Sequence, residues 1–573
     1  MKLPNIWGQG ALFAFSGLDG ECRVHSCLNA SLLGDLLGIR IQAKEIFDLY
    51  ILLDGIKDIH YDLVASDVIR ARLKDAQGQE SPVIITFMDQ CTVVGLCGRG
   101  RVQLRSLRAL SENRTASGSE FVSGASAFRF WREDRDSLTL FSFSTKGFIP
   151  VAKEKIQALA DAREAFLGRF EPILPRDEDA ALTFLKCVSV MKSQVYTADG
   201  QFCQRWTTPN RLPHRWLWLW DSVFHGLGNF LLDETLPRDS LLSVLDVQKE
   251  DGFVPHLARP SFTSDITQPP VLAWGAVKLY RRTGEKDFLR LAAPKLDKYL
   301  TWNINNRLNT DSGLFCWHVN TDSDNCRADE SGMDNSPRFD GVKQMECIDF
   351  CCFMANEAQA MAEIYDALGD AKGVWWRAYF EELRQRINTC LWDEKDQLYY
   401  DRVPGSGFHR VKSVASFLPL FAGVCTENTA AALIGHLKDE STFHTRLPIP
   451  SVAMDDPTYG TDMWRGPVWI NYNYMICEGL RRYGFGSLAD EIVLKTVREI
   501  ARFFLTDGVV YEMYDPDGLM SPRSIRRKGP VIEPYDPRVR YQVIRDYGWT
   551  SSLCAAMIAE NPHLFGGSKT QAK

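Results

Sequence analysis

The feature that most constrains the fold of this 573-residue chain is a succession of helix-like segments between residues 177 and 559. Several of the short gaps between them carry Gly, Asp or Pro, which end helices. The expected helices are 177–196, 216–232, 236–247, 268–283, 287–303, 348–368, 371–392, 412–421, 426–437, 464–483, 486–504 and 546–559. Twelve helices that pair as six antiparallel hairpins can close into a double-layered barrel. The sequence therefore predicts a mainly α protein in which residues 177–573 form an (α/α)6 barrel.

The first 150 residues have a different pattern. Short β-branched or aromatic runs at 82–87, 102–104, 128–131 and 138–143 are separated by Gly/Arg and Ser/Gly segments. Residues 111–119 are expected to be a polar loop. This pattern predicts an antiparallel β-sandwich-like domain over residues 1–150, and a linker with a helix over 151–176.

Three of the remaining connections are long, namely 197–215, 304–347 and 505–545. Loops of this length inside a compact domain usually carry function. The second contains Asp334, and the third contains Glu512 before an Asp-Pro-Asp-Gly turn. A local structural role is an alternative for each: an Asx-turn or helix cap for Asp334, and an exposed strand end for Glu512.

Tryptophan is the compositional oddity, with fifteen in the chain. Four of them fall within fifteen positions and two more bracket a second cluster; these are Trp206, Trp216, Trp218, Trp220, Trp464 and Trp469. Aromatic rings stack on pyranose faces, and a carboxylic acid can protonate a glycosidic oxygen. Two carboxylates on separate loops, together with these clusters of tryptophan, predict a glycosidase.

Charge and cysteine usage narrow the partners and the compartment. A net charge of −7 and a pI near 5.9 argue against nucleic acid or an anionic membrane as partner. The fifteen cysteines show no metal-ligand spacing, and neither a signal sequence nor a run of about 20 apolar residues is evident. We expect a cytoplasmic protein with reduced thiols, a small carbohydrate substrate, and neither metal nor cofactor. The oligomeric state stays open.

Seven motifs in the helical part are similar to those of glycoside hydrolase family 63 and its relatives, the trehalases and the mannosylglycerate and glucosylglycerate hydrolases. They occur in the family order over some 330 residues, whereas the β region offers no motif to compare. The motifs are Trp218-Leu219-Trp220-Asp221-Ser222, Gln248 to His256, Thr267-Gln268-Pro269-Pro270, Glu330-Ser331-Gly332-Met333-Asp334-Asn335-Ser336, Trp464 to Asn471, Tyr511-Glu512-Met513-Tyr514 and Gly548-Trp549-Thr550.

The resemblance implies an inverting α-glycoside hydrolase with Asp334 as general acid and Glu512 as general base. It also implies a pocket for one terminal sugar, in which Asp221 accepts hydrogen bonds from vicinal hydroxyls. N-capping is the alternative for Asp221, and a structural ion pair is the alternative for Arg465. The expected substrate-binding residues are Trp218, Trp220, Asp221, His256, Gln268, Gly332, Trp464, Arg465, Trp469, Tyr514 and Trp549.

Substrate identity is not fixed by these motifs. An exo-acting α-glucosidase on a small cytosolic glucoside is the expectation, with an α-mannosidase-type or glycosylglycerate hydrolase as alternative. A sugar phosphorylase and a non-catalytic carbohydrate-binding protein are further alternatives. The basic segment 523–528 after Glu512 is interpreted either as solvated loop surface or as a lid that adds charge near an acidic aglycone.

Overall fold

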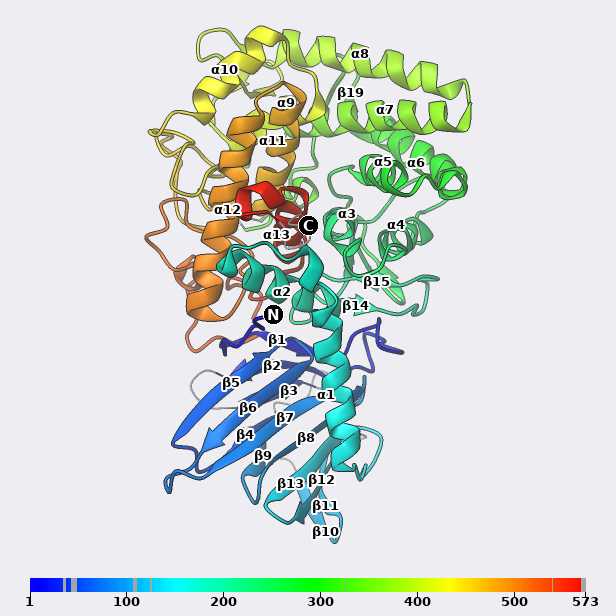
Figure 1. Ribbon diagram of the computed structural model, residues 1–573. Helices are drawn as coiled ribbons and strands as arrows, with labels where there is room; N and C mark the ends of the chain where they lie inside the picture. Colours follow the sequence, from blue (N-terminus) through cyan, green and yellow to red (C-terminus); the bar gives the residue numbers. More distant parts are fainter. Residues whose placement is uncertain are drawn as a thin grey trace.

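The computed structural model describes residues 1–567 apart from 34–37, 43–48, 107–110, 124–125, 324 and 538. It consists of an N-terminal region of antiparallel sheet and a larger helical region (Figure 1). A mainly α chain with sheet at its N-terminus is therefore confirmed.

Two antiparallel sheets make up the N-terminal region. One has five strands in the order β1-β2-β3-β4-β9, and the other has eight in the order β10-β11-β12-β13-β8-β7-β6-β5. The rings of Phe13 on β1 and Phe87 on β7 lie 4.8 Å apart and join the sheets. The strands are β1 Leu12–Ala14, β2 Asn29–Leu33, β3 Gly38–Gln42, β4 Leu49–Leu53, β5 Asp58–Val64, β6 Val68–Lys74, β7 Glu80–Asp89, β8 Thr92–Gly98, β9 Val102–Ser106, β10 Ser111–Thr115, β11 Gly118–Ser123, β12 Ser126–Arg135 and β13 Leu138–Ser144.

The prediction of a polar loop at 111–119 is wrong, because β10 and β11 form a hairpin there with Thr115 paired to Gly118. The linker contains α1 (Lys153–Gly168), which packs against β6, β7 and β8 of the larger sheet (Figure 1). A short 3-10 turn, Glu171–Ile173, leads from α1 into the helical region.

Each of the twelve predicted helices has a counterpart in the structure. They are α2 Glu178–Ser193, α3 Leu219–Asn229, α4 Leu236–Asp246, α5 Leu272–Thr283, α6 Lys286–Arg307, α7 Ile348–Leu368, α8 Lys372–Cys390, α9 Leu418–Ala422, α10 Glu427–Leu437, α11 Ile470–Arg482, α12 Gly486–Asp507 and α13 Gly548–Glu560. Several end at a glycine in the left-handed conformation, such as Gly284 (φ 72°) after α5, which lets the chain turn without a Cβ clash.

The odd-numbered helices from α3 to α13 make a continuous circuit of contacts: α3 with α5, α5 with α7, α7 with α9, α9 with α11, α11 with α13, and α13 back to α3. Several even-numbered helices contact members of this circuit, as α4 does with α3, α8 with α7 and α12 with α11. The helices α3 and α13 are buried along almost their whole length.

Asp546 ties the sheet region to the helices. Its fully buried carboxylate accepts hydrogen bonds from Leu12 N in β1 (2.7 Å), from Lys186 Nζ in α2 (2.8 Å) and from Val510 N (3.1 Å). Val510 lies two residues before Glu512, so the hydrogen bonds of Asp546 also help to fix the segment that carries the predicted base. Among the helices described, none combines the length and apolar character that a bilayer span requires.

Candidate active site

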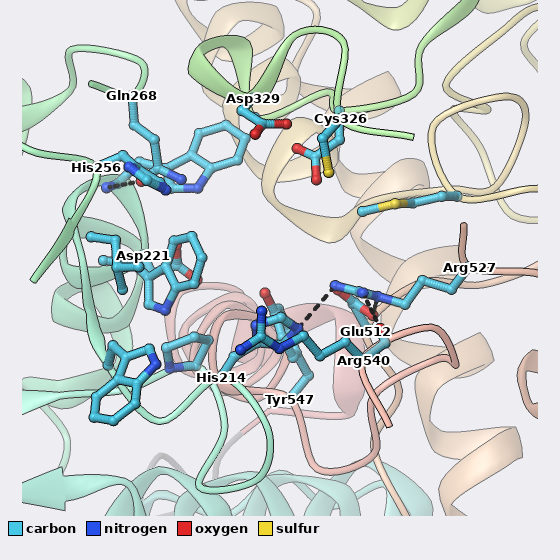
Figure 2. A pocket seen from close by; sticks show the side chains of 18 of the residues that line it. His214, Asp221, His256, Gln268, Cys326, Asp329, Glu512, Arg527, Arg540 and Tyr547 are labelled. Atoms are coloured by element: carbon cyan, nitrogen blue, oxygen red, sulfur yellow. Dashed lines mark hydrogen bonds and ion pairs between the residues drawn. The ribbon is translucent and has the colours of Figure 1, made fainter. Parts of the chain in front are cut away.

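A cavity of about 290 Å³, whose lining side chains are drawn in Figure 2, lies where the N-terminal ends of α3, α5, α11 and α13 meet the long connections. Trp218, Trp469 and Tyr547 are the residues that immediately precede α3, α11 and α13. Segments more than 300 positions apart therefore converge on one space. Among the sequence-predicted residues, the cavity is lined by Asp334, Glu512, Trp218, Trp220, Asp221, His256, Gln268, Gly332, Trp464, Trp469 and Trp549.

The other two predicted residues do not line it. Arg465 donates to both carboxylate oxygens of Asp340 (2.6 and 3.3 Å) and to the carbonyl of Asn335, so the structure supports the alternative of a structural ion pair. Tyr514 is fully buried, and its hydroxyl accepts the backbone N–H of Tyr511 (3.0 Å). We correct the predicted substrate contact for both residues on this ground.

Glu512 is held as an ion pair on one side of the cavity. Arg527 donates to its two carboxylate oxygens from Nε (2.7 Å) and Nη2 (2.9 Å), and the backbone N–H of Ile544 adds a longer bond of 3.3 Å. Burial opposes the charge on Arg527, but Glu512 outweighs it and raises the pKa of the guanidinium. This bidentate ion pair fixes the orientation of the Glu512 carboxylate at the cavity.

Asp334 lies in a different setting. The Lys528 ammonium forms an ion pair with its Oδ2 and also reaches Cys326 Sγ at 2.8 Å. Burial disfavours the charge on Lys528, yet Asp334 raises the pKa of this amine overall. Arg527 and Lys528 are consecutive, so one basic segment contacts both predicted catalytic carboxylates.

Asp221 is a buried carboxyl group of the cavity. It is 3% exposed, and its Oδ1 has no hydrogen-bond partner. Burial raises its pKa well above the usual range, and the charge of Glu512 raises it further. The residue that caps α3 is Trp218, so N-capping does not explain Asp221. A buried carboxyl group with a free oxygen fits a ligand that brings its own hydrogen-bond donors.

Tryptophans form the walls. The rings of Trp464 and Trp469 stack at 4.0 Å with 4° between their planes, and Trp549 meets Trp469 edge to face at 5.7 Å. The indole nitrogens of Trp218, Trp464 and Trp549 are enclosed without a hydrogen-bond acceptor. Indole donors beside apolar ring faces match the alternation of hydroxyls and C–H faces on a sugar.

Gly332 fixes the position of one of these walls. It adopts φ 70° after the 3-10 turn Asp329–Ser331, and a Cβ at this position would lie 2.3 Å from the Trp220 ring. The glycine therefore serves both a left-handed turn and a close approach. The imidazole of His256 bonds Ser264 Oγ at 2.7 Å, and burial lowers its pKa to about 4, so it is neutral near pH 7.

The family profile described as "Mannosylglycerate hydrolase MGH1-like glycoside hydrolase domain" matches residues 214–519, which include most of the cavity-lining segments. The chain belongs to this glycoside hydrolase family. The resemblance to glycoside hydrolase family 63 is thereby confirmed.

Three relatives illustrate the match. A mannosylglycerate hydrolase of Thermus thermophilus is 29% identical over 398 residues, which cover 54% of this chain and 91% of that protein. An uncharacterized protein of Borreliella burgdorferi is 27% identical over 254 residues, and the match spans only 51% of its length and 43% of this chain. The crystal structure of the family 63 mannosylglycerate hydrolase from another strain of Thermus thermophilus superposes with a TM-score of 0.53 at 23% identity, over 65% of this chain and 99% of that one, and shows a shared fold.

Glu330 belongs to the same family motif as Asp334 but has a structural role. It is 1% exposed, it accepts two hydrogen bonds from Arg307 (2.6 and 2.9 Å), and it accepts the backbone N–H of His318 (3.0 Å). It does not line the cavity in the described part of the chain.

Several lining residues were not predicted as substrate contacts, namely His214, Arg259, Asp329, Arg527, Lys528, Arg540 and Tyr547; Trp216 also lines the cavity and was predicted only as a member of the tryptophan cluster. The basic run 523–528 was the available signal for Arg527 and Lys528, since a lid that contributes charge was one of its two interpretations. Asp329 had a signal as well, because it directly precedes the Glu-Ser-Gly motif.

Two clusters of described residues bring potential metal ligands within 4.8 Å of one another: Cys326, Asp329 and Asp334, and Cys347, Asp349 and Asp401. Each already contains a protein cation. Lys528 contacts the first cluster, and Arg338 forms ion pairs with both carboxylates of the second. A basic side chain among the ligands disfavours a metal ion at either place.

Proposed function

We propose that this chain is an inverting α-glycoside hydrolase in which Asp334 is the general acid and Glu512 the general base. The observation that carries the proposal is the convergence of these two carboxylates on one small, tryptophan-walled cavity. Ligand sites of enzymes are typically about 300–1,000 Å³, so a cavity of about 290 Å³ suits a small glycoside rather than a polysaccharide segment.

The proposed reaction follows from the different surroundings of Glu512 and Asp334. Glu512, oriented by its ion pair with Arg527, accepts a proton from a water molecule as that water attacks the anomeric carbon. The glycosidic C–O bond breaks, and Asp334 gives a proton to the departing oxygen. Attack from the face opposite to the leaving group converts an α-glycoside into a β-sugar, and inversion calls for carboxyl groups about 6.5–9.5 Å apart.

The sugar unit would bind to the polar groups of the cavity wall that have no hydrogen-bond partner within the protein. Asp221 Oδ1 and the indole N–H groups of Trp218 and Trp464 offer one acceptor and two donors to hydroxyls. A glucosyl or a mannosyl unit satisfies this description equally well.

For the leaving group we propose glycerate or a comparable small carboxylate. The Thermus thermophilus relative, similar over 91% of its length, is a mannosylglycerate hydrolase. Arg259 and Arg540 also line the cavity, and Arg259 stacks on the Trp216 ring at 4.2 Å with its Nε buried and unpartnered. Such a guanidinium suits a carboxylate on the substrate. The predicted α-glucosidase on a neutral glucoside becomes the second candidate.

We also infer that the circuit of odd-numbered helices is the inner layer of an (α/α)6 barrel and that the two N-terminal sheets form a sandwich. Each of the fifteen cysteines is a free thiol, which supports a reducing compartment and hence a cytosolic solute as substrate. A substrate of this kind needs no nucleic-acid or membrane partner.

The test is release of free sugar from α-mannosylglycerate, α-glucosylglycerate and the neutral disaccharide trehalose, each with and without inorganic phosphate. We expect hydrolysis of a glycerate conjugate without phosphate, and NMR should detect the β anomer first. A sugar phosphate as product would identify a phosphorylase, and absence of turnover on every substrate would favour a non-catalytic binding protein.

Two substitutions separate the carboxylate roles. Asp334→Asn should reduce hydrolysis of oxygen-linked glycosides by about 10²–10⁴-fold but affect an α-glycosyl fluoride much less, because fluoride departs with little protonation. Glu512→Gln should impair both substrates, since water must be activated in either case. Equal sensitivity of the two variants to the leaving group would contradict the assignment.

A further inference from the structure

The acid side of the cavity contains a carboxyl group that the mechanism above does not use. Asp329 and Asp334 both line the cavity, and an oxygen of each lies within 4.8 Å of the other and of Cys326 Sγ. Figure 2 shows Asp329 and Cys326 on the same side of the cavity, away from Glu512 and Arg527. One general acid would suffice for the reaction, so the second carboxyl group needs its own explanation.

Asp329 has no role in holding the loop through its buried oxygen. Its Oδ1 is enclosed and has no hydrogen-bond partner. The neighbouring Glu330, in contrast, is fully engaged with Arg307 and with the backbone of His318. Of these two consecutive acidic residues, Glu330 therefore has a structural role and Asp329 lines the cavity.

The charges around Asp329 do not balance if every carboxyl group is ionised. Lys528 supplies one positive charge, and it is paired with Asp334. Glu330 is matched by Arg307, and burial raises the pKa of the Cys326 thiol, which stays neutral. Asp329, Asp334 and Lys528 together are therefore neutral only when one carboxyl group carries a proton. Two close carboxylates cannot both ionise without cost.

The pKa directions agree with this count. Burial, and next the charge of Asp334, raise the pKa of Asp329 to about 7. A group with this pKa is largely protonated below neutrality and loses its proton as the pH rises through about 7.

We propose that Asp329 is a positioning residue that retains, beside Asp334, the proton that Asp334 delivers to the glycosidic oxygen. This inference rests on the proposed function of Asp334. In the resting site the proton lies on Asp329, and the Lys528 ammonium lies against Asp334. Coupled carboxyl groups of this kind titrate as a pair.

The proton inventory closes over one turnover. The proton passes from Asp329 to Asp334 and from Asp334 to the leaving oxygen as the C–O bond breaks. Glu512 takes a proton from the attacking water, which becomes the new hydroxyl group of the sugar. Glu512 then releases that proton to solvent, and the Asp329–Asp334 pair takes one up through the cavity, so nothing is oxidised or reduced.

Two substitutions should shift the alkaline limb of the kcat/KM profile in opposite directions. Asp329→Asn leaves Asp334 matched only by Lys528, so the proton is lost at lower pH, and activity on an oxygen-linked glycoside at pH 7 should fall by about 10²-fold. Lys528→Met removes the positive charge, so the pair keeps its proton to higher pH and the limb moves up. Damage to the fold would not produce shifts of opposite sign.

The control is Asp322→Asn, which removes an exposed carboxylate from the same connection. It should leave the limb in place. With an α-glycosyl fluoride, Asp329→Asn should keep near wild-type kcat, because no proton is needed. A limb that stays in place in Asp329→Asn, or that moves the same way in both cavity variants, overturns the inference.

A measurement without substrate separates this inference from the proposed function. Infrared difference spectra of the resting protein between pH 6 and pH 9, on either side of the Asp329 pKa of about 7, should show a protonated carboxyl band that Asp329→Asn lacks. Identical wild-type and Asp329→Asn spectra overturn the inference even if the enzyme is active. Should the band be present while Asp334→Asn hydrolyses oxygen-linked glycosides at the wild-type rate, the proposed acid is wrong, and with it the delivery of this proton.

Discussion

Replacing Gly332 by alanine tests whether the Trp220 wall must lie where the structure places it. Gly332 has φ 70°, and the added methyl group would lie 2.3–2.4 Å from two carbons of the Trp220 ring. Carbon atoms that are not bonded prefer about 3.5–4.0 Å, so the ring has to move by about 1 Å.

Two costs follow from this geometry. The left-handed backbone costs an alanine about 1–2 kcal/mol of folding free energy. Forcing a methyl group into a packed site adds about 1–3 kcal/mol. A displacement of about 1 Å in a substrate-positioning group can reduce the rate by about 10²-fold, so kcat/KM should fall by that order.

The chain offers a matched control in Gly341, on the same connection. It has φ 72°, but a Cβ there would meet nothing within 4 Å. Gly341→Ala should therefore show the backbone cost without the clash: a loss of about 1–2 kcal/mol in urea unfolding and unchanged kcat/KM.

The assay compares both variants in urea unfolding and in hydrolysis of the substrate found by the screen described above. Loss of activity in Gly341→Ala as large as in Gly332→Ala would show that loop strain, not the tryptophan, controls the rate. Full activity in Gly332→Ala would show that the Trp220 ring is not a fixed wall.

Three further outcomes are expected. Lys186→Met should lower the free energy of unfolding by about 3–5 kcal/mol, because it leaves the buried Asp546 carboxylate without its cation, and urea unfolding would measure this. Arg465→Met should change stability by about 1 kcal/mol or less and leave kcat/KM near wild type, since its ion pair is partly exposed and outside the cavity; a tenfold loss of activity would restore Arg465 as a substrate contact. Trp464→Phe keeps the stack on Trp469 but removes the indole donor, so KM should rise by about fivefold to tenfold, as one lost hydrogen bond implies.

The helical region was largely predictable because helix length, apolar content and glycine ends are local signals. The start of α11 was placed too early, at residue 464, because the aromatic segment before it resembles a helix in composition but forms turns and bends up to Gly466. The hairpin of β10 and β11 escaped prediction because every residue of β10 is exposed and no apolar alternation marks it.

The site residues also separate into those with a recognisable sequence signal and those without one. Asp334, Glu512 and the tryptophans were found because they lie within family motifs. The side chains that set their charge, Arg527 and Lys528, come from the basic run, and nothing local distinguishes a solvated arginine from one that is buried against a carboxylate. The fold of the 505–545 connection, which is 41 residues long, decides which carboxylate each cation contacts. The local sequence of this connection does not predict that fold.

The carboxylate of Asp546 has a consequence for the architecture of the whole chain. Because one buried side chain takes hydrogen bonds from β1, α2 and the backbone just before Glu512, the N-terminal region holds in place the segment that carries the proposed base. Gly8 and Gly508 also approach each other so closely that a Cβ on either would clash with the backbone of the other. Shortening the chain from its N-terminus should therefore impair catalysis before it abolishes folding, and the segment from Gly508 to Glu512 should be the first part to exchange its amide protons.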